Sequence, residues 1–216
     1  MLVFISFTLM LSVLSSPISY ARDMPNNGDA PRFPADQQTP EQKAAFAEAE
    51  RLVKATYGSS FQLKDAQGNL LGPFGVLSYT PTTFLPYLNY TQAYTVLPHL
   101  TAKERELSIL ATASVTESEY IIYAHKSIGI SVGLSKKQVK DASEGEVPEG
   151  LGKREKFVYK TALRIAKKFG TISDDLFEEA VQQLGRDGVS QLAQEVGGYL
   201  LSSVLVNVAD VQVPTT

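Results

Sequence analysis

The chain has no cysteine and no tryptophan, and neither sign of charge is in large excess. The absence of cysteine excludes disulfide bonds, thiolate metal sites, cysteine nucleophiles and thiol redox cycles. With 20 Lys and Arg residues against 23 Asp and Glu residues, the net charge is -3, so the sequence lacks the basic surplus of a nucleic-acid-binding protein. We therefore expect neither a nucleic acid partner nor thiol chemistry.

The length and composition of the chain are typical of one folded domain. The chain has 216 residues, of which 44% are hydrophobic and 20% are charged. A chain of this length and hydrophobic content can bury a sizeable core. The sequence therefore predicts a folded domain rather than general disorder.

The first 21 residues have the pattern of a signal peptide. Residues 2–18 carry no charge, and Ser19-Tyr20-Ala21 supplies a small-x-small cleavage pattern ahead of Arg22. An uncleaved membrane anchor is the less favoured alternative, because an apolar run of about 17 residues is at the short limit for a membrane span. We expect cleavage after Ala21 and a secreted or periplasmic protein with no stable membrane insertion.

Residues 22–39 are rich in Pro, Asn, Asp and Gln and have no apolar period, which predicts a flexible lead-in. The folded domain is expected over residues 40–214. Thr39 to Gln42 forms a capping-box pattern with Pro40 at the first helical position, and Gly58 marks the end of this first helix.

Residues 59–79 contain glycines and no sustained apolar period, so the sequence predicts a surface loop with a short hairpin at 67–69. Most of the remaining chain has helical periodicity between clear start and stop signals. Helices are expected over residues 80–97, 102–115, 119–131, a short segment from 136, 153–169, 173–184 and 189–207. No stretch alternates strictly between apolar and polar residues, so the predicted class is all-α.

Two ionisable residues lie on apolar faces of consecutive predicted helices. Glu106 has Ile109 and Leu110 at helical spacing, and His125 has Ile121 and Ile128. Because an unpaired buried charge is unfavourable by several kcal/mol, we expect Glu106 and His125 to pair. Two interpretations stay open: a carboxylate that orients an imidazole for proton transfer, and a buried hydrogen bond that only fixes helix packing.

The second histidine, His99, precedes a helix cap in a loop, which favours a solvated imidazole. Two histidines far apart in sequence, without cysteine, make a weak ligand set. We therefore expect no metal site and no cofactor.

Several segments resemble the carboxymuconolactone decarboxylase-like family, which includes the alkylhydroperoxidase D-like proteins. Residues 97–110 (LPHLTAKERELSIL) are similar to that family's Leu-Thr-x-x-Glu-Arg-Glu-Leu-x-Ile-Leu segment. Residues 120–125 (YIIYAH), followed by Gly133-Leu134-Ser135, resemble its histidine helix and the stop of that helix. Residues 199–214 are similar to its closing helix and tail, so the resemblance covers roughly residues 40–214.

The resemblance implies a helical bundle of the alkylhydroperoxidase D-like type, of about six to eight helices, which assembles as a homotrimer or homohexamer. Peroxidase members carry a Glu, a Cys-x-x-Cys and a His as a relay. Counted back from His125, the Glu falls on Glu106, but the cysteine positions fall on Ser118 and Ile121. Thiol peroxidase chemistry is therefore excluded. Many decarboxylase-type members have Glu where this chain has Ile121, so lactone decarboxylation does not transfer directly.

The polar side chains left around the implied pocket predict proton-transfer or decarboxylation chemistry on a small, cyclic or lactone-type acid. His125 is the expected acid and base, and Glu106 its orienter. For Tyr120 two interpretations stay open: a hydrogen-bond donor to an enolate oxygen, and a core aromatic whose hydroxyl is satisfied within the protein. Ser118 and Tyr123 are expected to bind substrate. The alternative is a non-catalytic, oligomeric small-molecule-binding protein that kept the fold.

One further motif concerns export. Asn89-Tyr90-Thr91 satisfies the glycosylation pattern in a chain predicted to be exported, although it lies in a predicted helix.

Overall fold

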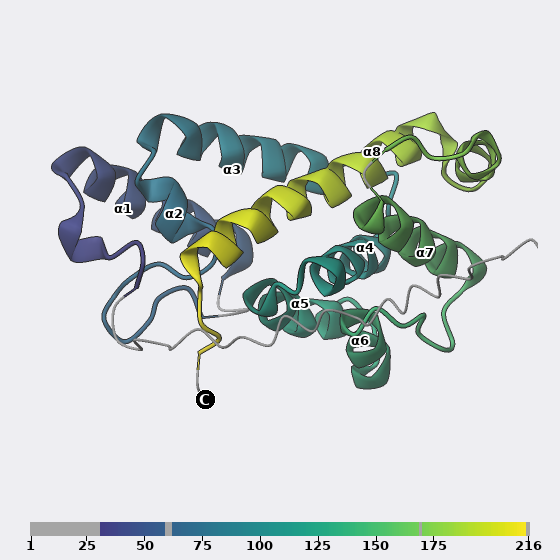
Figure 1. Ribbon diagram of the computed structural model, residues 1–216, viewed down its shortest axis with the longest axis horizontal. Helices are drawn as coiled ribbons and strands as arrows, with labels where there is room; N and C mark the ends of the chain where they lie inside the picture. The colour runs from purple at the N-terminus through teal and green to yellow at the C-terminus, as the bar shows by residue number, and fades with distance from the viewer. Residues whose placement is uncertain (1–30, 59–61, 169, 215–216) are drawn as a thin grey trace, which may run out of the picture. The chain divides into compact units, whose positions relative to one another are not determined.

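The structure is a computed structural model that describes residues 31–58, 62–168 and 170–214 (Figure 1). Pro31–Thr216 form one compact unit. The predicted signal peptide and residues 22–30 of the predicted lead-in lie outside the described residues.

Helices make up nearly all regular structure in the described residues, so the all-α prediction is confirmed (Figure 1). The elements are η1 (Ala35–Gln37), α1 (Pro40–Tyr57), α2 (Phe74–Ser78), α3 (Pro81–Thr95), α4 (Ala102–Thr116), α5 (Glu119–Ser131), α6 (Lys136–Ser143), α7 (Lys153–Lys167) and α8 (Asp174–Ala209). An isolated antiparallel bridge, Lys64 to Leu70, closes the hairpin predicted at 67–69.

The helix starts follow the capping signals of the sequence. Thr39, Thr101 and Ser135 each accept a hydrogen bond from the backbone N–H of the third helical residue, and a Gln or Glu side chain there returns a bond to the cap. These reciprocal bonds satisfy donors that a helix start leaves unpaired. The starts of α1, α4 and α6 therefore agree with the prediction.

Helix α2 corrects the prediction of a loop over residues 59–79. Its residues Phe74, Leu77 and Ser78 are buried, and the helix contacts α1, α3 and α8. Five residues are too few for a helix that is stable by itself. Packing against neighbours that are distant in sequence therefore stabilises α2, which is why periodicity missed it.

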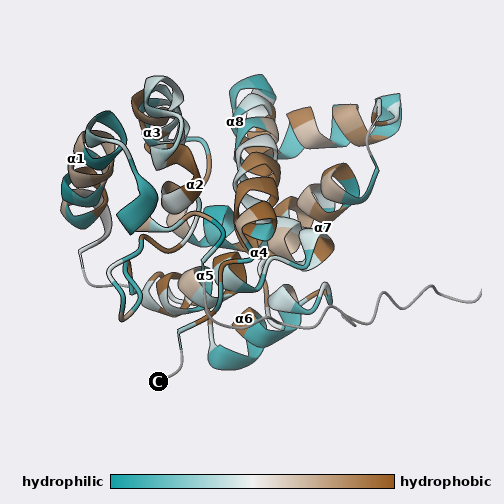
Figure 2. Cartoon of the chain, turned by 60° about the vertical axis from the view of Figure 1, so that its left-hand side comes forward, coloured by the Kyte–Doolittle hydropathy of each residue, from teal (hydrophilic) through white to brown (hydrophobic). Residues whose placement is uncertain are grey.

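Helix α8 contains both of the last two predicted helices. Gly185 has φ 70° and ψ 166°, a non-helical conformation that favours glycine, so the chain bends there. The two parts of α8 run in different directions (Figures 1 and 2). No helix of the described residues is long and apolar enough to span a membrane.

Helix α4 is the centre of the packing and contacts α5, α6, α7 and α8. Leu107 and Leu110 on α4 are completely buried, and each contributes about 1.5–3 kcal/mol by leaving water. Hydrophobic residues gather along α4 and α8, whereas α6 is largely hydrophilic (Figure 2). Glu106 on α4 and Glu195 on α8 are both buried, and most of the other buried residues of these two helices are apolar.

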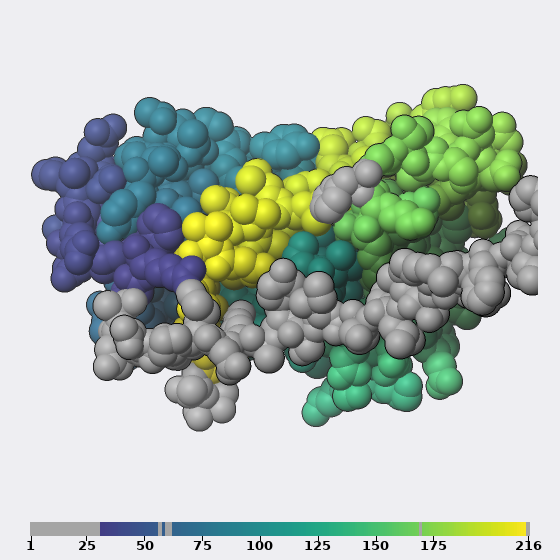
Figure 3. Space-filling model, in the orientation of Figure 1, coloured from purple at the N-terminus to yellow at the C-terminus, as the bar shows by residue number. Residues whose placement is uncertain are grey.

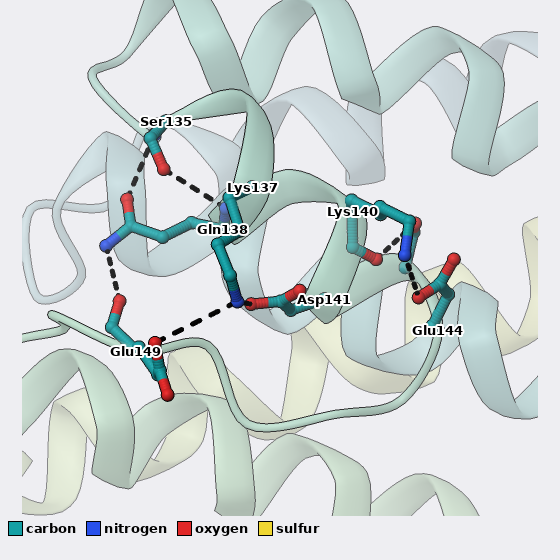
Figure 4. Close-up of polar contacts among 8 residues, drawn as sticks. Ser135, Lys137, Gln138, Lys140, Asp141, Glu144 and Glu149 are labelled. Atoms are coloured by element: carbon teal, nitrogen blue, oxygen red, sulfur yellow. Dashed lines mark hydrogen bonds and ion pairs between the residues drawn. The ribbon is translucent and has the colours of Figure 1, made fainter.

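Helix α6 is fastened by polar contacts at the edge of the bundle (Figure 4). The Gln138 side chain accepts from the Ser135 backbone N–H at 2.9 Å and donates to the Glu149 carbonyl at 3.0 Å. Lys137 pairs with Asp141 at 2.7 Å, one helical turn away. The bond from Gln138 to Glu149 holds the loop of residues 144–152 against α6, whereas the Lys137 pair lies within the helix.

The described part of the predicted lead-in is tied to the helices. The Phe33 ring contacts the Tyr79 ring edge-on, with centroids 5.4 Å apart, and the Tyr79 hydroxyl donates to the Pro34 carbonyl at 2.6 Å. Gln38 donates to the Ser78 hydroxyl at 2.6 Å in a buried setting. Residues 31–39 thus pack beside α2.

One end of α8 reaches the surface. The C-terminal part of α8, yellow in Figure 3, forms a strip of this face of the molecule. Leu201, Val204 and Val208, which lie three or four residues apart on α8, are exposed. Helical spacing places these three side chains on one apolar face.

Candidate functional site

The predicted pairing of Glu106 and His125 is confirmed. His125 Nδ1 lies 2.8 Å from Glu106 Oε2, and the two residues are 8% and 7% exposed. An ionised carboxylate can only accept hydrogen bonds, so Nδ1–H is the donor to it. The bond fixes the imidazole and leaves Nε2 as the nitrogen available for proton transfer.

The surrounding helices fix this pair. Glu106 lies in the first half of α4, whose start is fixed by the capping box at Thr101, and His125 lies in the middle of α5. The Tyr199 ring of α8 meets the imidazole at 88° with centroids 5.0 Å apart. Three helices therefore meet at the imidazole.

A cavity of about 60 Å³ lies beside His125. Space of this size accommodates several water molecules or a small organic group. Its wall is mostly aromatic or apolar and comes from the start of α2, from α3, α5 and α8: Pro73, Phe74, Tyr87, Leu88, Thr91, Tyr94, Thr95, Tyr120, Ile121, Ala124, His125, Tyr199 and Ser202. A concave apolar site with a few polar groups is typical of small-molecule binding.

Several hydroxyl groups in the cavity wall donate hydrogen bonds to other atoms of the protein. Ser202 Oγ donates to the Gly198 carbonyl at 2.8 Å, so the 2.7 Å contact between Tyr87 and Ser202 has Tyr87 as its donor. Thr91 Oγ1 donates to the Leu88 carbonyl at 3.0 Å. His125 is therefore the ionisable group best placed to exchange a proton with an occupant of the cavity.

Tyr120 lines the cavity, but its hydroxyl is engaged elsewhere. The hydroxyl donates to the Gln62 carbonyl at 2.8 Å. Burial is the larger cause that raises the pKa of Tyr120 above its usual range, and the neighbouring Tyr123 is the smaller one. The predicted hydrogen bond from Tyr120 to an enolate oxygen would require the bond to Gln62 to break.

Ser118 and Tyr123, the two predicted substrate-binding residues, are not among the residues that line the cavity. Ser118 is the N-cap of α5, about 10 Å along the helix from His125. Its hydroxyl oxygen is buried without a hydrogen-bond partner in the described residues. Tyr123 lies two residues before His125, about 200° away around the helix, and its ring contacts Tyr120.

Sequence reasoning missed Glu195. This α8 residue is 1% exposed, and both of its carboxyl oxygens are buried, with the Gln191 side chain as a polar neighbour. Burial raises its pKa to about 7, against the opposing effect of Arg105. The sequence does contain a signal for the burial of Glu195, because Leu192 and Tyr199 lie at helical spacing on either side of it. Glu106 has apolar neighbours at the same kind of spacing.

The other histidine lies in a loop that Gln191 holds in place. The buried Gln191 amide oxygen accepts from the backbone N–H groups of His99 and Leu100, and its nitrogen donates to the carbonyls of Tyr94 and Leu97. His99 is not among the cavity residues. No three His, Asp or Glu side chains in the described ranges are grouped closely enough to hold a metal ion.

Several solved structures are similar to this chain. One is the alkylhydroperoxidase AhpD core structure of an uncharacterized peroxidase-related protein from Ralstonia eutropha JMP134. It has a TM-score of 0.68 and 19% identity, and the match covers 86% of this chain and 93% of that one. The chain has the alkylhydroperoxidase D fold.

Another similar structure is that of a variant of the debrominase Bmp8 in complex with 2,3,4-tribromopyrrole. Its TM-score is 0.65 at 11% identity, and the match covers 83% of this chain and 94% of that one. No protein-family model and no curated protein matches the sequence. Identities this low establish the alkylhydroperoxidase D fold alone, and a fold by itself does not determine activity.

Proposed function

We propose that this chain is an enzyme that transfers protons on a small, cyclic or lactone-type acid, with decarboxylation as one outcome. His125 would be the general acid and base, and Glu106 the residue that orients it. The observation that carries this proposal is the 2.8 Å contact of His125 with Glu106 beside an apolar cavity. Histidine is suited to the role because its ordinary pKa lies near neutral pH.

In this mechanism, His125 Nε2 takes a proton from an acidic carbon or hydroxyl of the substrate. The imidazolium that forms keeps its Nδ1–H bond to the Glu106 carboxylate, which stabilises the positive charge. His125 then returns the proton to another substrate atom, or to the carbon from which carbon dioxide has left. Such general acid–base catalysis contributes about 10²–10⁴-fold to a rate.

The cavity supports a small ring compound as substrate. It measures about 60 Å³, and aromatic side chains such as Phe74, Tyr94 and Tyr199 line it. Flat apolar rings pack favourably against such walls. The debrominase structure with the same fold holds 2,3,4-tribromopyrrole, itself a small ring.

The alternative function is a non-catalytic, oligomeric small-molecule-binding protein. One observation favours it: the hydroxyls of Tyr87, Thr91, Tyr120 and Ser202 are bonded to other protein atoms and do not converge on His125. A binder would need the cavity but not proton transfer.

Hydrogen exchange on candidate substrates tests the proposal. The purified chain is incubated in D₂O with a panel of small cyclic ketones, lactones and their carboxylic acids, and proton NMR follows exchange and product formation. We expect at least one compound to exchange or react with the unaltered chain and not with His125→Gln. A compound that binds to both proteins, with no chemical change in either, would support the binder instead.

We also propose export and self-association. Cleavage after Ala21 would release a secreted or periplasmic protein that has no stable membrane insertion. The exposed apolar residues Leu201, Val204 and Val208 support a homotrimer or homohexamer, because a face of this kind is commonly covered by another subunit.

A further inference from the structure

The cavity beside His125 has a wall without formal charge. Among the described residues that line it there is no Lys, Arg, Asp or Glu, and His125 is the side chain whose ordinary pKa lies near neutral pH. The wall is built from uncharged parts of the chain: residues 66–102, 120–125 and 196–209 contain no Lys, Arg, Asp or Glu. An occupant of the cavity therefore meets no Lys or Arg side chain in this wall.

The pair of His125 and Glu106 does not supply a free positive charge. His125 Nδ1 lies 2.8 Å from Glu106 Oε2, so with an ionised Glu106 the pair is negative when the imidazole is neutral, and neutral when the imidazole is protonated. The neighbouring cation, Arg105, donates to the Leu100 carbonyl at 3.1 Å and is not among the lining residues. A carboxylate in the cavity would lose its hydration without gaining a cation of its own, which is unfavourable.

The wall offers acceptors for hydrogen bonds. Because Nδ1–H is donated to Glu106, the neutral imidazole presents Nε2 as an acceptor. Thr91 Oγ1 and Ser202 Oγ each donate to a carbonyl of their own helix, so each has a lone pair to offer an occupant. A ligand O–H or N–H finds a partner at these atoms, whereas a carboxylate oxygen, which can only accept, does not.

We propose that the cavity selects an uncharged ring compound whose acidic group is a hydroxyl or a ring N–H, such as a phenol, an enol or an azole, and not a carboxylate. The ligand donates to His125 Nε2, and the aromatic side chains of the wall cover its ring. In the transfer step, the O–H or N–H bond breaks, its electron pair stays on the ligand, and Nε2 binds the proton. This inference rests on the proposed function and narrows it to proton transfer, because decarboxylation needs a carboxylate on the substrate.

Binding of matched ligands tests the proposal without turnover. Phenol, benzoate and anisole share one ring, but benzoate is anionic at pH 8 and anisole has no O–H. NMR signals of His125 report binding, and the second histidine, His99, lies outside the cavity and is an internal reference. We expect phenol to bind at least about 100-fold more tightly than benzoate and about tenfold more tightly than anisole. Benzoate that binds as tightly as phenol, or phenol that does not bind, would overturn the proposal.

A cation placed in the wall should weaken this preference. Thr91 lines the cavity and is half-buried on α3, whereas the next residue, Gln92, is exposed and is not among the lining residues. We expect Thr91→Lys to bind benzoate at least about tenfold more tightly than the unaltered chain does, through a charge-assisted hydrogen bond. Gln92→Lys is the matched control, because it adds the same charge outside the wall, and it should keep the preference for phenol.

Equal benzoate affinities of the two lysine variants would contradict the role of the uncharged wall. Should Thr91→Lys not fold, the comparison of phenol with benzoate on the unaltered chain still decides the proposal. The outcome can also be separated from the fate of the proposed function. Selective phenol binding without turnover of any panel compound would retain the ligand class and remove the enzymatic assignment. Turnover of a carboxylate that requires His125 and releases carbon dioxide would retain the enzyme and remove this ligand class.

Discussion

Replacement of Glu195 by Gln should remove a pH-dependent loss of folding stability. In the folded protein, burial raises the pKa of Glu195 from its ordinary 4.5 to about 7. The folded state then holds this proton up to a higher pH than the unfolded chain does. The contribution of Glu195 to folding stability is therefore fully present below about pH 4.5 and is lost as the pH rises through about 7. Above that pH the side chain is ionised in both the folded and the unfolded state.

The magnitude follows from the two pKa values. A difference of about 2.5 in pKa corresponds to about 3 kcal/mol at 1.36 kcal/mol for each tenfold change in proton affinity. This is a large share of the roughly 5–15 kcal/mol by which domains are stable. Glutamine has nearly the same shape and does not ionise, so Glu195→Gln removes this pH dependence and little packing.

The assay is urea unfolding of both proteins at several pH values between 4.5 and 8. The free energy of unfolding of Glu195→Gln, relative to the unaltered chain, should rise by about 3 kcal/mol across this range. The difference between the two free energies of unfolding removes the contributions of the other titrating groups, because both proteins share them. A difference that stays constant with pH would refute the reasoning, because it would mean that Glu195 is ionised throughout.

Further outcomes are expected elsewhere in the chain. Gln191→Ala should lower the free energy of unfolding by about 3 kcal/mol in urea, because four backbone groups lose their partner; unchanged stability would contradict the role of this amide. Gly198→Ala should lower the melting temperature at a cost of about 1–3 kcal/mol, because a β-carbon there would overlap the Tyr94 phenol. Intact mass of exported protein should begin at Arg22, and residues 1–21 retained in membranes would disprove cleavage. Sedimentation should report a trimer or a multiple of it, against which a stable monomer at micromolar concentration would count.

The sequence was most informative where local chemistry decides structure. Capping at Thr39, Thr101 and Ser135 involves residues three positions apart, so the helix starts could be predicted. The pair of Glu106 and His125 could be predicted as well, because two charges on apolar faces of neighbouring helices need each other.

Features that depend on distant residues could not be predicted in the same way. Helix α2 is stabilised by contacts with α1, α3 and α8, which no local periodicity reports. The Tyr120 hydroxyl bonds to the Gln62 carbonyl, 58 residues away in sequence. Tyr123 is expected from the sequence to bind substrate, but it lies about 200° around the helix from His125 and is not among the residues that line the cavity.

Glu195 shows how partial the sequence signal is. Its helical spacing from Leu192 and Tyr199 predicts burial, yet only the fold brings it within electrostatic reach of Arg105, Glu106 and His125. Burial of one side chain can be deduced from periodicity, whereas its neighbours on other helices depend on packing.

The central claim is that His125 transfers protons and Glu106 orients it, and the most direct test measures turnover and melting temperature together on His125→Gln and Glu106→Gln. We expect His125→Gln to abolish turnover while the protein stays nearly as stable, and Glu106→Gln to reduce turnover by about 10²-fold. If the pair only fixes helix packing, both changes will instead lower stability, by about 3–5 kcal/mol for a broken buried pair. Loss of stability with unchanged turnover would contradict the catalytic assignment.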